Sequence, residues 1–77
     1  MKQHYATQTR KRNVLLLYDF IKKKKDEMTL TQICSLFAFS TGLSSFTVND
    51  YKEVLIGSGV MKVENDRVIE LIDIEKK

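Results

Sequence analysis

One short segment, Ser40 to Ser45, interrupts a chain that otherwise follows helical and strand-like patterns, and it constrains the fold more than any other feature. Gly42 can adopt the left-handed backbone conformation that a tight turn requires, and Ser44 or Ser45 can cap a following helix. Apolar residues at helical spacing lie on both sides of the segment. The sequence therefore predicts two helices joined by a tight turn.

The helix before this turn is expected over residues 29–39. Thr29-Leu30-Thr31-Gln32 has the pattern of a capping box, in which Thr29 caps the helix and Gln32 binds back to it. The apolar stripe of this helix includes Cys34, the one cysteine of the chain. No histidine or acid lies near Cys34 in the sequence to activate the thiol, so we interpret it as a small buried apolar side chain.

Two further helices are predicted. The helix after the turn spans residues 45–56, with Val48, Tyr51 and Leu55 facing inward and glycines following its end. The first helix spans residues 9–25, and its apolar stripe is Val14, Leu17, Tyr18 and Ile21. Residues 1–8 are polar and are expected to form a flexible basic arm.

The C-terminal part has the pattern of a β-hairpin over residues 60–72. Two segments rich in Val and Ile flank Asn65-Asp66, a pair of residues that tolerates the positive φ angles of a two-residue turn. Met28-Thr29 is a candidate for a short third strand against the hairpin. The expected fold is thus a single domain over residues 1–77, mainly α with a small β-hairpin, in the order α-β-α-α-β-β.

Composition excludes several classes of protein. A chain of 77 residues buries too little surface for a large substrate pocket, and one cysteine cannot form an internal disulfide framework. No apolar run approaches the roughly 20 residues of a membrane span, and no secretory signal is expected. His4 is the one histidine, so neither a metal site nor a catalytic triad is expected. We expect no enzyme activity, cofactor, small-molecule substrate or membrane partner, and a cytoplasmic location.

Charge is distributed unevenly along the chain. Residues 1–25 carry a net charge of +7 and residues 26–77 a net charge of −4. A polyanion is the obvious partner for the basic part. The alternative is that the run Lys22 to Lys25 only keeps a small domain soluble.

These features together resemble the winged helix-turn-helix family of DNA-binding proteins. The resemblance rests on Thr29 to Cys34, on Thr41-Gly42-Leu43-Ser44-Ser45-Phe46-Thr47-Val48, on Tyr51, Leu55 and Gly59, and on the hairpin. The stretch from Cys34 to Gly42 is about one helical turn longer than in compact bacterial members, as in some small archaeal and viral ones. Lys52 occupies a position that is usually apolar in the family.

The resemblance implies a double-stranded DNA-binding protein that regulates transcription, with the third helix in the major groove, the hairpin as a wing, and a location at the nucleoid or in the cytoplasm of a viral host. Asn49 could bond adenine, and Phe46 could pack against a thymine methyl group. Ser44 and Ser45 could contact DNA or serve as caps alone, and Asn49 could simply be exposed. The candidate DNA-contacting residues are Arg10, Lys11, Arg12, Ser44, Ser45, Phe46, Thr47, Asn49, Lys52, Lys62 and Arg67.

A second hypothesis uses the same fold differently. Asp50 and Glu53 are expected on the outward face of the third helix, where they would repel phosphate, and the hairpin tip is acidic. A winged-helix module for protein–protein contact or assembly, which does not bind DNA, is therefore the alternative.

A homodimer is the last expectation. Leu16 and Phe20 lie far from the centre of the apolar stripe of the first helix, so this second apolar face needs a covering partner. A second copy packed on Leu16 and Phe20 would cover it and could present two third helices to successive half-sites. The competing possibilities are that the hairpin or the tail Ile72-Asp73-Ile74 folds over this face, or that the tail itself forms the dimer.

Overall fold

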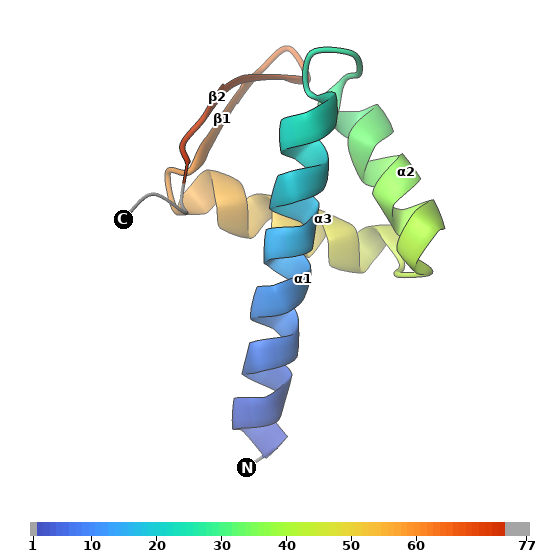
Figure 1. Ribbon diagram of the computed structural model, residues 1–77, viewed down its shortest axis with the longest axis vertical. Helices are drawn as coiled ribbons and strands as arrows, with labels where there is room; N and C mark the ends of the chain where they lie inside the picture. Colours follow the sequence, from blue (N-terminus) through green and yellow to red (C-terminus); the bar gives the residue numbers. More distant parts are fainter. Residues whose placement is uncertain (1, 74–77) are drawn as a thin grey trace.

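The structure, a computed structural model, contains three helices followed by a two-stranded antiparallel hairpin (Figure 1). It describes the backbone of residues 2–73 and the side chains of residues 9–73. The elements are α1 (Lys2–Lys24), α2 (Leu30–Thr41), α3 (Ser45–Gly57), β1 (Met61–Glu64) and β2 (Arg67–Leu71). The expected mainly α domain with a small hairpin is confirmed at this level.

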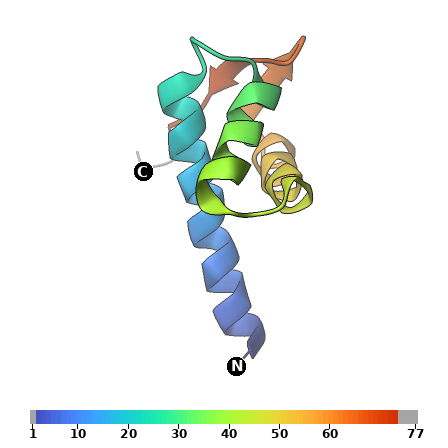
Figure 2. The ribbon, with the colours of Figure 1, turned by 90° about the vertical axis from the view of Figure 1, so that its right-hand side faces the viewer.

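The first helix is longer than predicted. It begins at Lys2, so residues 2–8 are helical and the expectation of a non-helical arm there is corrected. Its N-terminal turns extend beyond the other elements, and Figure 2 shows α2 and α3 beside its C-terminal half. No helix in the described part of the chain is long and apolar enough to cross a membrane.

The turn between α2 and α3 follows the predicted local rules. Thr29 and Gln32 form the capping box at the start of α2, with the Thr29 amide donating to Gln32 Oε1 at 3.0 Å. Gly42 has φ of 79° and its amide donates to the Ala38 carbonyl at 2.9 Å. Ser44 then caps α3. Each helix end at this turn is therefore fixed by the residue types found there.

The hairpin has the predicted two-residue turn. Asn65 and Asp66 have φ of 53° and 60°, and β1 pairs with β2 from Met61 opposite Leu71 onward. The predicted strand at Met28-Thr29 is wrong. Because the Thr29 amide is bound by the Gln32 side chain, it cannot join a strand ladder. The next two residues contact the hairpin instead: the Leu30 amide donates to the Asp66 carbonyl at 2.8 Å, and the Thr31 amide donates to Asp66 Oδ1 at 3.2 Å.

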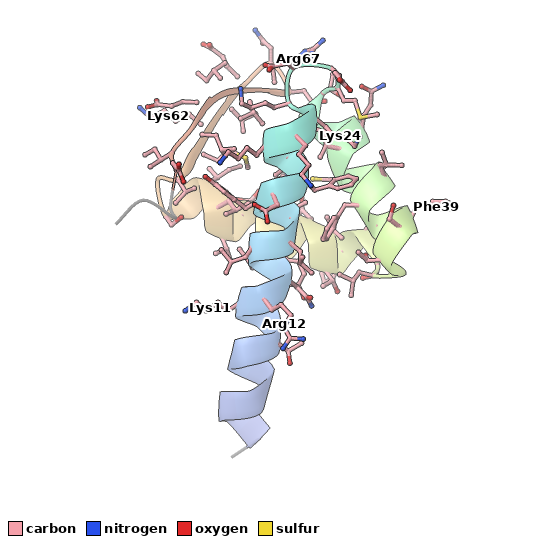
Figure 3. The ribbon with its side chains drawn as sticks, in the orientation of Figure 1. Lys11, Arg12, Lys24, Phe39, Lys62 and Arg67 are labelled. Carbon is pink, nitrogen blue, oxygen red and sulfur yellow. The ribbon has the colours of Figure 1, made fainter. Side chains whose placement is uncertain are left out.

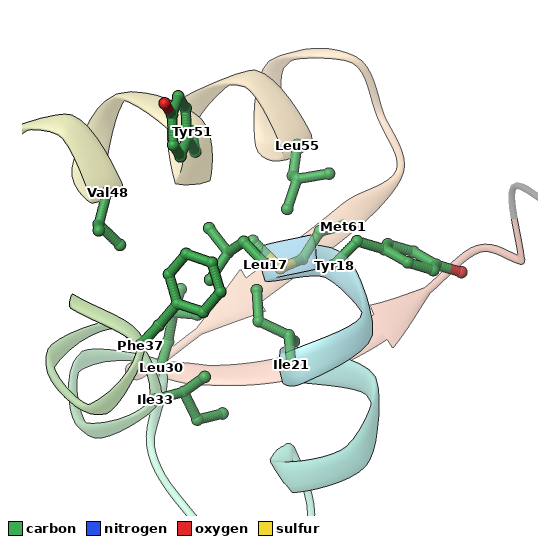
Figure 4. Close-up of a cluster of buried hydrophobic side chains, with 10 residues drawn as sticks. All are labelled: Leu17, Tyr18, Ile21, Leu30, Ile33, Phe37, Val48, Tyr51, Leu55 and Met61. Carbon is green, nitrogen blue, oxygen red and sulfur yellow. The ribbon is translucent and has the colours of Figure 1, made fainter. Parts of the chain in front are cut away.

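The core lies where the three helices and β1 meet (Figure 4). Its buried members are Leu17, Tyr18, Ile21, Leu30, Ile33, Phe37, Val48, Tyr51, Leu55 and Met61. The predicted inward stripes of all three helices supply most of this set. Tyr18 also links α1 to the residue that follows the hairpin, because its hydroxyl donates to the Ile72 carbonyl at 2.6 Å.

Candidate nucleic-acid interface

The N-terminal half of α3 presents several of the predicted contact residues to solvent. Ser45, Phe46 and Asn49 are exposed, and 85% of Phe46 is accessible. Ser44 and Thr47 serve the helix instead. The Ser44 hydroxyl accepts from the Thr47 amide at 3.1 Å and donates to the Thr47 hydroxyl at 3.0 Å. Of the five predicted residues at this end of α3, three thus have side chains that form no hydrogen bond or ion pair with another described residue.

The two acids on α3 each lie close to a cation. Arg10 of α1 is 3.7 Å from the Asp50 carboxylate, and its guanidinium is 5.9 Å from the centre of the Tyr51 ring. Lys52 Nζ is 3.8 Å from the Glu53 carboxylate. Both carboxylates are exposed to solvent, so the two pairs add little stability. Their effect is to reduce the negative potential of α3.

Three consecutive cations of α1 leave the helix in different directions. Successive residues differ by about 100° around a helix, and Figure 3 shows Lys11 and Arg12 on different sides of α1. Arg10 faces α3 and, together with Lys11, lines a shallow apolar groove between α1 and Val54 of α3. Arg12 is exposed and, at about 100° per residue, lies nearly on the opposite side of α1 from Arg10. Only Arg10 and Lys11 therefore flank the candidate interface.

A second groove separates α2 from α3 and reaches the hairpin turn. Polar side chains line it, namely Thr31, Ser35, Ser45, Asn49, Lys52 and Asp66. Lys52 is half-buried and lines this groove, so it is not enclosed in the core although its position is usually apolar in the winged helix-turn-helix family. Thr31 and Ser35 were not among the predicted residues. The two residues are four positions apart and so lie on one polar face of α2. This spacing was the sequence signal that could have identified them.

Cys34 lies at the base of the same groove and is half-buried, as interpreted from its place on the apolar stripe. Burial raises the pKa of its thiol, and the nearby Lys52 lowers that pKa by less. A protonated thiol is a poor nucleophile. Its environment therefore gives Cys34 no reactive character.

The remaining predicted cations lie on the hairpin and at the C-terminal end of α1. Lys62 Nζ is 3.5 Å from Glu70 on the opposite strand, whereas Arg67 is exposed at the turn (Figure 3). Lys24 lies 5.6 Å from the centre of the Phe20 ring, and Lys25 is 3.4 Å from Asp26. The lysine run starts about 18 Å along α1 from Arg10. These cations therefore do not form one cluster with Arg10.

The residues predicted for dimer contact, Leu16 and Phe20, have different surroundings. Phe20 is half-buried against Phe37, with ring centres 5.5 Å apart, while Leu16 keeps 48% of its surface exposed. The tail residue Ile72 lies at Tyr18, and Ile74 lies outside the described residues. The described part of the tail leaves Leu16 uncovered.

No protein-family profile matches this chain, and neither a curated protein nor a solved structure is significantly similar to it. Within residues 9–73, no group of three metal-binding side chains lies together. The function must therefore be argued from the arrangement around α3.

Proposed function

We propose that the chain is a winged helix-turn-helix protein that binds double-stranded DNA and regulates transcription, with α3 as the recognition helix and the hairpin as the wing. The observation that carries this proposal is the 3.7 Å contact between Arg10 and Asp50. It joins the basic part of the chain to the helix that exposes Ser45, Phe46 and Asn49. Phosphate-binding groups and base-reading groups are thereby adjacent, as DNA recognition needs.

The exposed side chains of α3 suit the edges of bases. Asn49 can form two hydrogen bonds with adenine, and Phe46 offers a large apolar surface for a thymine methyl group. Ser45 can donate to phosphate at the edge of the groove between α2 and α3. The first turn of α3 holds no acid, so the positive end of its dipole is open to an anion.

The two acids of α3 are compatible with this proposal. Asp50 and Glu53 each have a cation within 4 Å, at 3.7 and 3.8 Å. When DNA approaches, Arg10 can exchange its carboxylate partner for a phosphate, and Asp50 can accept from the amino group of cytosine. The acids then restrict the bases that fit and do not prevent binding.

A mobility-shift assay across a salt series tests the proposal. Replacing Arg10 and Lys11 together by Ala should lower the slope of log affinity against log salt by about two, because each phosphate contact contributes about 0.9. Arg12→Ala is the matched control and should leave the slope unchanged, since Arg12 lies nearly on the opposite side of α1 from Arg10, which faces α3. Asn49→Ala should reduce discrimination between sites at constant slope.

One observation favours a second function. Phe46 is 85% exposed beside Asp50 and Glu53, a combination that also suits a protein partner. No binding to any duplex at low salt would contradict the DNA proposal and favour a protein–protein contact module. In that case Phe46→Ala should abolish capture of the protein partner.

A further inference from the structure

A second stripe of side chains runs along α1 on the face opposite the one that packs into the core. Arg12, Leu15, Leu16 and Asp19 follow at i, i+3, i+4 and i+7, so all four share one side of the helix. All four are exposed, with Leu15 at 38% and Leu16 at 48%. Neither Arg12 nor Asp19 forms an ion pair with another residue that the structure describes. The stripe has an apolar centre and opposite charges at its two ends.

This order of charges makes the stripe complementary to itself. We propose that it binds the same stripe of a second copy of the chain, with the two α1 helices antiparallel and crossing midway between Leu15 and Leu16. Two-fold symmetry then places Leu15 opposite the partner's Leu16 and Arg12 opposite the partner's Asp19. Each favourable contact occurs twice, and the four leucines form a central apolar patch.

Other arrangements of the same two helices are disfavoured by charge. A parallel pair places Arg12 against Arg12 of the partner subunit and brings the exposed Lys22 and Lys23 against their own copies. An antiparallel pair shifted by one turn places Arg12 opposite the partner's Lys23 or, in the other direction, opposite the partner's Leu15, and in both cases separates it from the partner's Asp19. Like charges directly opposite each other repel, so one register satisfies both the leucines and the ion pairs.

Pairing through this stripe leaves the rest of the molecule accessible. The opposite side of α1 carries Leu17 and Ile21, both fully buried, and packs against α2 and α3 (Figure 2). Among the exposed residues of α3, Val54 shares a groove with Leu15, whereas Ser45, Phe46 and Asn49 do not line that groove. The inference goes beyond the proposed DNA binding and does not depend on it.

Sedimentation velocity over a protein concentration series, without DNA, tests the pairing by charge reversal. Arg12→Asp places an acid opposite the partner's Asp19, and Asp19→Arg places two arginines opposite each other. Each single variant should raise the dimer dissociation constant about tenfold. The double variant R12D/D19R restores opposite charges and should return the constant to within about threefold of the original. Leu16→Glu should give a folded monomer.

Controls separate pairing from folding and from general charge effects. Lys62→Asp makes the same change in charge as Arg12→Asp, but on the hairpin, and should leave the dimer intact. Circular dichroism should show unchanged helicity in all variants, because the altered side chains are exposed. A chain that stays monomeric at every concentration, a double variant that fails to recover, or a dimer unaffected by both single reversals would each overturn the proposal. DNA affinity is measured separately, so failure of one proposal leaves the other testable.

Discussion

The junction between α2 and the hairpin differs from α1 in what its polar side chains bind. At the junction, Asp66 Oδ1 accepts from the Thr31 amide at 3.2 Å and from the Thr31 hydroxyl at 2.9 Å, and the Asp66 carbonyl accepts from the Leu30 amide. Along α1, Lys11, Arg12 and Asp19 form no ion pair with any residue described here. Polar groups at the junction therefore hold the fold, whereas these three charged groups of α1 are available to partners.

This difference follows from local geometry. Asp66 sits in a two-residue turn that fixes its position, so its carboxylate can cap the start of α2 at little entropic cost. The long side chains of α1 lie on a helix with only one packed face, and fixing them against a neighbour costs more entropy. Partners that bring their own charges can compensate for that cost.

The two regions differ most in burial, and this difference should have the largest effect on the free energy of unfolding. Ile33 of α2 is fully buried, so Ile33→Ala should lower the free energy of unfolding by about 2–5 kcal/mol. A domain of this size has little more stability than that, and the variant should be largely unfolded at room temperature. Urea unfolding followed by circular dichroism measures the effect.

Leu16→Ala is the matched change on α1. At a concentration where the chain is monomeric, it should cost less than about 1 kcal/mol, because Leu16 is half exposed. If Leu16→Ala lowered the free energy of unfolding as much as Ile33→Ala, the outer face of α1 would belong to the buried core.

The hydrogen bonds between Asp66 and Thr31 at the junction should have the next largest effect on the free energy of unfolding. Asp66→Ala removes two hydrogen bonds to Thr31 and puts Ala at a positive φ, so it should lower the free energy of unfolding by about 1–2 kcal/mol. Asp66→Asn keeps an acceptor oxygen and tolerates the same φ, and should recover most of the loss. Glu64→Ala, an exposed acid of the same hairpin, should change stability by less than about 0.5 kcal/mol.

How well the sequence predicts structure also differs between the regions. Thr29 with Gln32, Gly42, and Asn65-Asp66 were assigned to a capping box, a turn and a hairpin, and the structure confirms each. These residues act within three or four positions along the chain, where geometry leaves few alternatives. In this region the predicted Met28-Thr29 strand was wrong, since the capping box uses the amide that the strand required.

Predictions for α1 and the candidate site were weaker. The polar composition of residues 2–8 suggested an arm, although Lys, Gln and Ala favour helix and no Gly or Pro stops it. The contact between Arg10 and Asp50 joins residues forty positions apart, and no local rule predicts it. The opposite directions of Arg10 and Arg12 follow from helical spacing, and the helix predicted over residues 9–25 already included both residues. Long-range packing therefore decides which cations flank α3.

The smallest expected effect concerns the hairpin, which belongs to the junction but carries two cations predicted to contact DNA. Lys62 is held 3.5 Å from Glu70, whereas Arg67 has no ion pair with another described residue. Because a paired lysine must give up its carboxylate to bind phosphate, Arg67→Ala should reduce the salt slope of DNA binding by about one, and Lys62→Ala by less. Lys62→Ala with Glu70→Ala serves as the control, since it removes the pair without changing net charge. A larger loss for Lys62 than for Arg67 in the same mobility-shift series would show that the hairpin contacts DNA through its strands and not through its turn.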